Sequence, residues 1–276
     1  MAKLDAIRRA LPQGITEDLW GLCPFAAVRE KLLPCRALHR LPPEAKTVLC
    51  VLFPYRAEVG AHNLSRYAIG PDYHQVVTPL LQQTARALGE QFPSNRFEAF
   101  VDNSPIPEVL AAALCGLGAV GDNGLLIHPA YGSWVFIGEI VTDLALGAEV
   151  QTVRECLHCG ACRRLCPGGA LGHNGLRRER CVSHLTQKKG ALTLEEQAAV
   201  RAGGLVWGCD RCQEVCPMNR AVKKRGLPCF QQELYPIIGP GEGETLPRRA
   251  FHWRPAAVLA RNFCIFDRED GNPMEE

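Results

Sequence analysis

The chain has 276 residues, of which 47% are apolar, and its formal net charge at pH 7 is only +2. This composition excludes a largely disordered chain and allows one large domain or two smaller ones. No stretch approaches the roughly 18 apolar residues that a membrane-spanning helix needs. Lys3, Asp5 and Arg8 interrupt any apolar run near the N-terminus, so we expect no signal peptide. These features together predict a soluble cytoplasmic protein.

The first 150 residues predict a domain that contains both helices and strands. The run KTVLCVLF at 46–53 is typical of a buried strand, and 73–91 carries apolar residues at helical spacing. In chain order, the sequence then predicts a strand at 96–101, a helix at 107–115, and strands near 125–128 and 133–141. Because these elements alternate irregularly, we expect an α+β fold rather than a parallel βαβ array.

Residues 151–225 form a second predicted unit, which is rich in cysteine and contains a helix near 193–202. The unit holds 14 Lys/Arg against 6 Asp/Glu, which gives it a local charge of +8. That charge suits an acidic electron donor or a nucleic-acid backbone, or it balances anionic clusters and their thiolates. Residues 226–276 are predicted as a C-terminal wrapping segment, with Pro and Gly frequent in 226–250 and a helix within 251–264.

Eight of the 14 cysteines lie between positions 156 and 216, in a pattern that indicates iron–sulfur ligation. The first run, C-x2-C-x2-C-x3-C-P, consists of Cys156, Cys159, Cys162 and Cys166. The second run consists of Cys209, Cys212 and Cys216, with Val206 where a further cysteine would stand. In two-cluster ferredoxins, three cysteines of such a run hold one 4Fe–4S cluster and the fourth belongs to the other cluster.

Two such clusters need eight thiolates, and the two runs supply seven. Cys181 lies between the runs and is the natural eighth ligand. The predicted ligands are Cys156, Cys159, Cys162 and Cys216 for cluster one, and Cys166, Cys181, Cys209 and Cys212 for cluster two. Zinc is the competing interpretation, but structural zinc usually takes pairs of C-x2-4-C at longer separations.

Residues 116–121 read GLGAVG and match the dinucleotide-binding pattern G-x-G-x-x-G. That pattern requires a strand before the glycines and a helix after them. Here the predicted helix 107–115 comes first and a strand-like segment follows, so the order is reversed. A tight turn, or a close approach of backbone to a bulky ligand, explains these glycines better.

Several segments together resemble the epoxyqueuosine reductase family. In chain order they are SRYAIGPDYH (65–74), VDNSP (101–105), CGLGAVGDNGLLI (115–127), YGSWVFIGEIVTDL (131–144), the first cysteine run, RCVSHLTQKKG (180–190) and WGCDRCQEVCPMN (207–219). The stretch from Trp253 to Asn262, which ends in ARN, fits as well. The resemblance covers roughly residues 46–262, with the segments in the right order.

The resemblance implies a cobalamin-dependent oxidoreductase that reduces epoxyqueuosine to queuosine, in tRNA or in a smaller substrate. Two 4Fe–4S clusters would relay the electrons, and the basic cluster unit suggests an acidic flavodoxin or ferredoxin as donor. The implied fold is a nitroreductase-like cobalamin-binding domain followed by a ferredoxin-like double-cluster domain. The cobalamin would have its lower base detached, which agrees with the lack of a D-x-H-x-x-G signature: Val77 stands where that motif has Gly.

The resemblance also implies which residues form the reaction site. Asp102 matches the family's proton donor, a catalytic role that requires burial or a bound cofactor to raise its pKa. Judged alone, Asp102 would be a turn residue at a strand end. The expected cobalamin-binding residues are Asp72, Tyr73, His74, Tyr131, Gly132, Ser133 and Trp134. Without the resemblance, these would be a helix start and a turn that enters a core strand.

The sequence departs from the family pattern in two respects. It stops just after ARN, whereas full-length members continue into HEAT-like repeats that help to grip tRNA, so we expect a short form with a weaker hold on tRNA. Pro71 and Asp122 stand where the family has basic residues, which is unfavourable for a polyanionic substrate. Two alternatives stay open: a cobalamin-dependent reductase of another small molecule, as in reductive dehalogenases, and a ferredoxin-like electron carrier without cobalamin.

Overall fold

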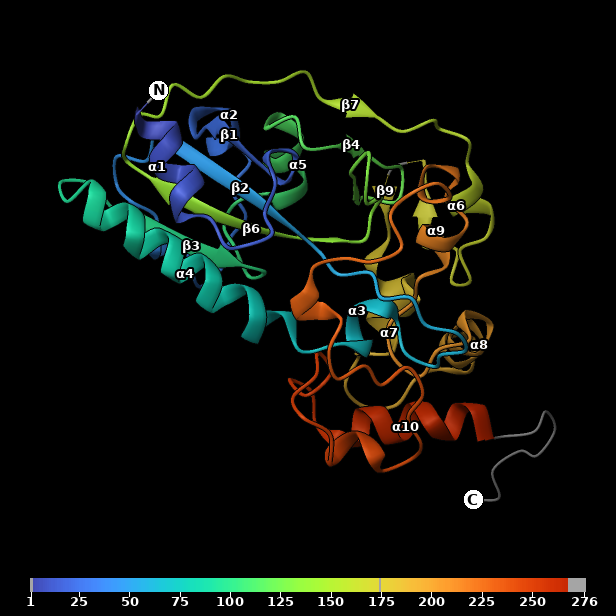
Figure 1. Ribbon diagram of the computed structural model, residues 1–276. Coiled ribbons are helices and arrows are strands. Elements are labelled where there is room, and N and C mark those ends of the chain that lie inside the picture. The colour runs from blue at the N-terminus through green and yellow to red at the C-terminus, as the bar shows by residue number, and fades with distance from the viewer. Residues whose placement is uncertain (1, 174, 268–276) are drawn as a thin grey trace.

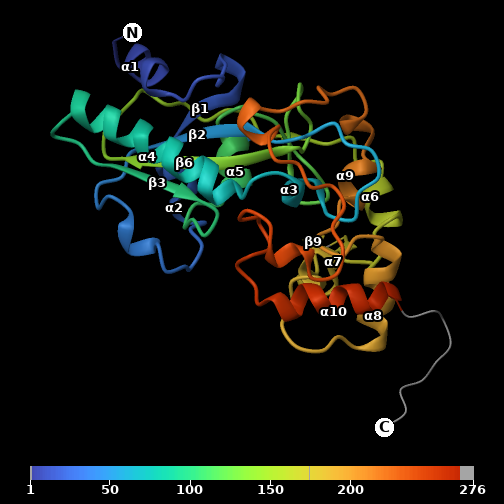
Figure 2. The ribbon, with the colours of Figure 1, turned by 60° about the horizontal axis from the view of Figure 1, so that its bottom comes forward.

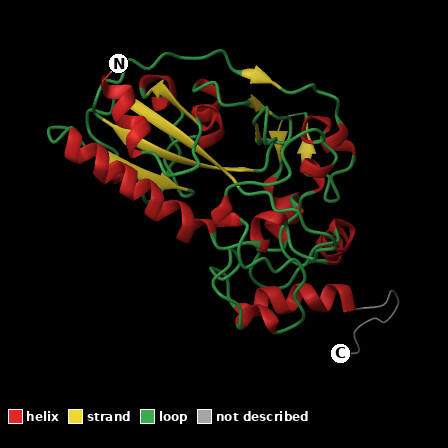
Figure 3. Ribbon diagram, in the orientation of Figure 1, coloured by secondary structure: helices red, strands yellow, loops and turns green. Residues whose placement is uncertain are grey.

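The computed structural model describes residues 2–173 and 175–267 (Figure 1). Residues 268–276, the last nine of the predicted wrapping segment, lie outside the described residues, as do Met1 and Asn174. Figure 3 shows the long strands gathered at one end of the molecule, with helices and loops at the other. Within the described ranges, no helix combines the length and the apolar character needed to cross a membrane.

The N-terminal part is built on a four-stranded antiparallel sheet in the order β1-β2-β6-β3. Its strands are β1 (Trp20–Pro24), β2 (Thr47–Pro54), β3 (Phe97–Val101) and β6 (Val135–Thr142). All eight residues of β2 are buried, because the strand is central and both faces of the sheet are covered. The three strand pairings of this sheet are all antiparallel, which agrees with the α+β expectation, and the strands predicted at 46–53, 96–101 and 133–141 are confirmed within a few residues.

Helices cover both faces of this sheet and divide its core into two layers (Figure 1). On one face, α1 (Ala2–Ala10) and α4 (Tyr73–Gln91) pack against Leu49 and Phe53 of β2. On the other face, α2 (Ala26–Arg29) and α5 (Glu108–Leu114) pack against its alternate residues. This arrangement follows from the two-residue period of a strand, which sends successive side chains to opposite faces. The predicted helices 73–91 and 107–115 are therefore confirmed.

The GLGAVG segment leads from α5 into a small second sheet. There β4 (Ala119–Val120) pairs with β5 (Leu126–Ile127) and with β7 (Arg154–Glu155). A Cβ atom on Gly118 would lie 2.7 Å from the Ile127 carbonyl oxygen, so the strands can approach only because that residue is glycine. The observed order is helix, glycines, strand, which is the reverse of a dinucleotide fingerprint.

The cysteine-rich unit consists of short elements. They are α6 (Ala161–Arg164), β8 (Leu171–Gly172), β9 (Gly175–Leu176), α7 (Val182–Leu185), α8 (Leu194–Gly203) and α9 (Arg211–Glu214). The longest of them, α8, confirms the helix predicted near 193–202. It begins at a capping box in which Thr193 and Glu196 bond each other's backbone N–H groups. Short 3-10 helices occur at Glu17–Leu19, Leu38–Arg40, Arg178–Arg180, Pro217–Asn219, Pro228–Phe230 and Glu242–Glu244.

The C-terminal segment runs back over both other parts before it ends in α10 (Ala256–Asp267). Phe230 packs into the core beneath α4, Phe251 packs around Trp207 together with α3 (Arg66–Ile69), and Ile265 packs against α7 and α8. Figures 1 and 2 both show α10 beside α8, at the end of the molecule away from the sheet. The helix predicted within 251–264 is found at Ala256–Asp267.

Candidate functional site

The eight cysteines predicted as ligands lie in two groups of four. Cys156, Cys159, Cys162 and Cys216 line one small recess, which Asp122 and Met218 also border. Cys166, Cys181, Cys209 and Cys212 line a larger cavity of about 360 Å³. Four thiols around one cavity form a donor set that fits a 4Fe–4S cluster. The structure thus brings together the same two sets that the spacing suggests, including Cys181 in place of the position occupied by Val206.

The thiols of the larger cavity are deeply placed. Burial raises the pKa of Cys209 to about 12 and that of Cys212 to about 12, with neighbouring thiols adding to the effect. Without metal these groups are therefore neutral near pH 7. Iron needs thiolates, so loading the site releases protons, and the positive charge of the iron must offset the cost of burial.

Backbone groups already point at two of the sulfurs. The backbone N–H of Asp122 donates to the Cys156 sulfur at 3.4 Å, and the N–H of Ala170 donates to the Cys166 sulfur at 3.2 Å. The cysteine loops take sharp turns at His158 and Gly160, which have φ angles of 48° and 70°. Hydrogen bonds to cluster sulfurs are one of the means by which a protein tunes the reduction potential.

Asp122, which stands where the family has a basic residue, is paired within the protein. One of its carboxylate oxygens lies 2.8 Å from Nδ1 of His158, and the other lies 3.2 Å from Arg163. His158 Nε2 lies 2.9 Å from Glu155, and hydrogen bonds to Asp122 and then to Glu155 raise the pKa of His158. His158 Nδ1 is 4.0 Å from the Cys156 sulfur, so its closer partner is the carboxylate. The negative charge of Asp122 is therefore compensated locally.

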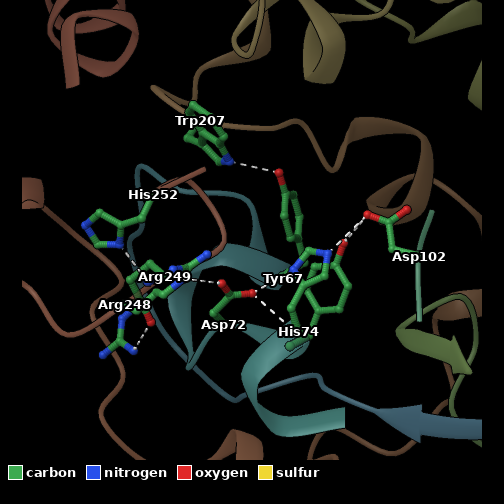
Figure 4. Close-up of polar contacts among 9 residues, drawn as sticks. Tyr67, Asp72, His74, Asp102, Trp207, Arg248, Arg249 and His252 are labelled. Carbon is green, nitrogen blue, oxygen red and sulfur yellow. Dashed lines mark hydrogen bonds and ion pairs between the residues drawn. The ribbon is translucent and has the colours of Figure 1, made fainter. Parts of the chain in front are cut away.

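The second cysteine run is fastened to the N-terminal domain by a buried carboxylate. Asp210 accepts hydrogen bonds from the Ser65 hydroxyl at 2.6 Å and from the Arg66 backbone N–H at 2.7 Å. Trp207 Nε1 donates to the Tyr67 hydroxyl at 2.8 Å (Figure 4). These contacts join positions about 140 residues apart and explain why two of the family-like segments lie side by side.

Asp102, the predicted proton donor, lies just after β3 with a left-handed φ of 53°. Its Oδ2 accepts a hydrogen bond from the Tyr73 hydroxyl at 2.9 Å and lies 3.3 Å from Nε2 of His74. His74 Nδ1 in turn lies 2.9 Å from Asp72, which also pairs with Arg248 at 3.2 Å. Figure 4 shows the His74 ring pointing at both carboxylates. The structure therefore brings Asp102 together with all three members of the Asp-Tyr-His motif.

The hydrogen bonds determine where the proton of this group lies. Bonds to Asp102 and then to Asp72 raise the pKa of His74 to about 9. The bond to His74 lowers the pKa of Asp102, although burial opposes it. Near neutral pH the structure thus holds imidazolium against carboxylate, which differs from the protonated Asp102 expected for a general acid. The Asp102 side chain is 59% exposed, so a ligand can reach it from solvent.

The four residues at 131–134 that are predicted to bind cobalamin have different surroundings in the structure. Ser133 lines the large cavity, and its hydroxyl donates to Gln213 at 2.9 Å. Gly132 lies against the Asn219 side chain, and Trp134 is buried edge-to-face against Tyr55. The fourth residue, Tyr131, packs beside Lys223. Ser133 is therefore the member that faces the cavity, while the other three contact protein groups.

Aromatic rings connect the large cavity to the Asp102 group. Phe136 lines the cavity and stacks on Tyr55 at a centroid distance of 4.3 Å. It also stacks on Tyr73 at 4.4 Å, and the Tyr73 hydroxyl bonds Asp102. The four thiols of the large cavity and the Asp102–His74 pair are therefore neighbours across one aromatic stack. The part of the cavity lining that the structure describes contains no histidine.

Sequence reasoning missed several residues of this site. They are Tyr67, Glu108, Asn123, Glu139, Arg163 and Arg248. Glu139 carried a usable signal, because it is an acidic residue in the middle of an apolar strand. Arg248 carried none, since its loop is 176 residues away from the carboxylate that it contacts.

Two family models match the chain. Residues 36–103 match a family described as Epoxyqueuosine reductase QueG, DUF1730, and residues 155–219 match a 4Fe-4S double cluster binding domain. A curated epoxyqueuosine reductase of Gloeobacter violaceus is 36% identical over 197 residues, which is 69% of this chain and 62% of the relative. The chain belongs to the epoxyqueuosine reductase family. It carries the double-cluster domain of that family, whose cofactor is cobalamin.

Solved epoxyqueuosine reductases share the fold. A selenomethionine-labelled epoxyqueuosine reductase superimposes with a TM-score of 0.80 at 24% identity, over 96% of this chain and 80% of the other. An epoxyqueuosine reductase with an epoxyqueuosine-modified tRNA-Tyr stem loop gives 0.75 at 22% identity, over 96% and 79%. By sequence, the chain spans 62% of the length of the Gloeobacter relative.

The ARN motif of this family has a structural role here. Arg261 donates hydrogen bonds to the carbonyl oxygens of Lys188 and Gly190 at 2.6 and 2.7 Å. The Asn262 side chain donates to Thr186 and Val206 at 2.7 and 2.8 Å. The motif thus holds the loop after α7 against the start of the second cysteine run.

Proposed function

We propose that this chain is an epoxyqueuosine reductase, an oxidoreductase that reduces epoxyqueuosine to queuosine in tRNA or in a smaller substrate. The observation that carries the proposal is the adjacency of two sites: a cavity lined by four thiols and a carboxylate–imidazolium group that share the Phe136 stack. Electron supply and proton supply are the two needs of epoxide reduction. Both therefore meet at one place between the domains.

The cysteines would hold two 4Fe–4S clusters in the two groups of four described above. Cobalamin, when bound, would supply a cobalt centre that takes single electrons from the nearer cluster. Ser133 and Phe136 are the residues of the N-terminal domain proposed to face it, since both line the cavity beside cluster two. We further propose that the N-terminal domain, about 1–150, is nitroreductase-like, with 151–225 as the cluster domain and 226–276 as the wrapping segment.

Asp102 and His74 would handle the proton. Opening an epoxide carbon–oxygen bond leaves charge on the oxygen, and a positioned acid that protonates it typically contributes 10²–10⁴-fold in rate. In this proposal His74 holds that proton and Asp102 orients it, while the contacts of Asp72 with His74 and with Arg248 fix the imidazole from behind. We propose that a bound substrate takes the proton at Asp102 Oδ2, with His74 as its source.

Two partners are proposed for this activity in a cytoplasmic setting. The first is tRNA, since a related enzyme of the same fold has been solved with a modified tRNA stem loop. The second is an acidic flavodoxin or ferredoxin that docks at cluster one. Cys159 is exposed there, its carbonyl accepts a hydrogen bond from Arg164, and the side chains of Leu157 and Leu165 are solvent-exposed. An apolar centre with basic neighbours suits an acidic redox protein.

The proposed function is tested by a cobalamin titration and a genetic assay. Cobalamin added to the anaerobically loaded protein should change its visible spectrum and saturate at one equivalent. A strain that lacks the gene should accumulate epoxyqueuosine in tRNA, and the gene should restore queuosine. Binding of cobalamin with no change in tRNA would instead favour another small substrate, and no binding at all would favour an electron carrier.

A further inference from the structure

Two acidic residues lie beneath Asp102 and have no role in the reaction as described so far. Glu139 lies in the middle of β6, its residue is fully buried, and neither of its carboxylate oxygens has a hydrogen-bond partner in the described part of the chain. Glu108 lies in the first turn of α5, six residues after Asp102, and its Oε1 is likewise buried and unpartnered. Buried carboxyl oxygens without partners, on a strand and on the helix that packs against it, are unusual in a protein interior.

The strand register places Glu139 on the face of the sheet that α5 covers. Glu139 is paired with Cys50 of β2 and with Phe100 of β3, and both belong to the core layer beneath α5. Polar and titratable groups near the two carboxyls come from β1, β2, α4 and the loop after β3. They are Asp102 and Ser104 from the loop after β3, Tyr73 and His74 from α4, Cys23 from β1 and Cys50 from β2.

A carboxylate without a partner in such surroundings takes up a proton instead of keeping its charge. Burial is the largest cause of the raised pKa of both groups: it brings Glu108 to about 8 and moves Glu139 well above the usual range of a glutamate. Negative charges nearby add to the effect, because Asp102 raises the pKa of Glu108 and Glu108 raises the pKa of Glu139. Because α5 packs on β6 and the charge of Glu108 raises the pKa of Glu139, the two carboxyls influence each other's titration.

The Glu108 carboxyl also lies near the loop that carries Asp102. The backbone N–H of Asp102 faces this carboxyl. That N–H belongs to a residue in the left-handed region, which a non-glycine residue keeps only when its surroundings hold it there. A neutral Glu108 can support the loop without placing a second negative charge behind Asp102.

We propose that Glu108 and Glu139 form a buried, proton-holding carboxyl pair that positions Asp102 against His74. Glu108 is then a positioning residue, which acts through the Asp102 loop and not on the substrate. When the pair loses its proton to solvent at high pH, the new charge repels Asp102 and the loop leaves its position. This inference rests on the proposed function, because Asp102 is the group that meets the substrate there.

The first experiment tests the pair without any activity. A folded-state pKa above the unfolded value means that the folded protein binds the extra proton, so stability falls as pH rises between the two values. The melting temperature of the wild-type holoprotein should therefore fall from about pH 5 to about pH 9 more steeply than that of Glu139→Gln and Glu108→Gln. Glu90→Gln, at an exposed position of α4, is the matched control and should keep the wild-type slope. Equal slopes in all four proteins would overturn the proposal.

The second experiment tests the positioning role through the pH profile of kcat. Wild-type kcat should fall as pH rises through about 8, where Glu108 ionises. In Glu108→Gln, which stays neutral, the fall should move toward about 9, where His74 loses its proton. Glu108→Ala, which cannot support the loop, should lose about tenfold in kcat below about pH 8, where the wild-type loop is held, with KM nearly unchanged.

The outcomes separate the two proposals. Absence of wild-type turnover, together with a steeper wild-type melting slope, would contradict the proposed function and leave the carboxyl pair supported. Normal turnover with one pH profile for the wild type and for Glu108→Gln would contradict the positioning role. Cluster absorbance measured on each variant confirms that it has folded and loaded.

Discussion

At the residue scale, the site depends on the position of a single proton. His74 lies between Asp72 and Asp102, and hydrogen bonds to these carboxylates hold the proton on the imidazole. Asp102 is the member of this group that is exposed to a ligand, and Tyr73 orients it from the other side. From this geometry we propose that His74 stores the proton and that Asp102 presents it to a substrate.

Replacing Asp102 with asparagine keeps the shape of the side chain but removes the acceptor charge. We expect Asp102→Asn to lower kcat by about 10²-fold or more, because proton delivery is lost while the pocket remains. The iron content and the cobalamin-binding curve should match those of the wild type. Wild-type turnover in this variant would remove Asp102 from the mechanism.

His74 makes a pH-dependent contribution to stability. Its pKa is raised from an ordinary value of 6.5 to about 9, so its stabilising effect is complete below 6.5 and is lost as pH rises through 9. The melting temperature of His74→Gln should therefore lie below that of the wild type at about pH 6 and approach it at about pH 10. A gap of the same size at both pH values would show that His74 contributes through packing and not through its charge.

At the element scale, α4 delivers the Asp-Tyr-His motif through its N-terminal cap. The Asp72 carboxylate accepts the backbone N–H of His74 at 3.1 Å, so the residue that starts the helix also orients the imidazole. Pro71-Asp72 gives a clear start signal in the sequence, and α4 was predictable to the residue. By contrast, α1 and β1 were missed, because β1 spans only five residues and includes Gly21 and Pro24.

The two functions of Asp72 can be separated by substitution. Asp72→Asn keeps a capping side chain, whereas Asp72→Ala removes the cap and should cost about 1 kcal/mol of stability. Both variants lose the charge that holds His74, so both should lower kcat by a similar factor. Thermal melts followed by circular dichroism, together with kinetics, check this. Equal stability of the two variants would show that the cap contributes nothing.

At the scale of the whole molecule, the site exists because three parts of the chain meet. The two cysteine groups could be predicted, since their spacing and the required count leave few alternatives. The contact of Asp210 with Ser65 and that of Arg248 with Asp72 could not, because they join residues 145 and 176 positions apart. The same holds for Glu108 and Glu139, whose proximity depends on how α5 packs on β6. Local patterns predict elements, whereas only packing shows which side chains share a proton.

The cluster assignment predicts a graded loss of iron. Cys181 lies with Cys166, Cys209 and Cys212, so Cys181→Ser should lose cluster two and bind about four irons per chain instead of about eight. Cys264 is exposed on α10, and Cys264→Ser is the matched control that should stay fully loaded. Iron and sulfide assays on anaerobically purified protein measure this. A full complement of iron in Cys181→Ser would refute its assignment as the eighth ligand.

The most direct test of the account is a single anaerobic reaction. Reconstituted protein, cobalamin, a low-potential reductant and epoxyqueuosine-modified tRNA are mixed, and the nucleosides are then identified by mass spectrometry. We predict that the wild type converts epoxyqueuosine to queuosine, while Asp102→Asn, equally loaded, leaves it unchanged. Retention of epoxyqueuosine by a wild-type protein that holds both clusters and cobalamin would contradict the account.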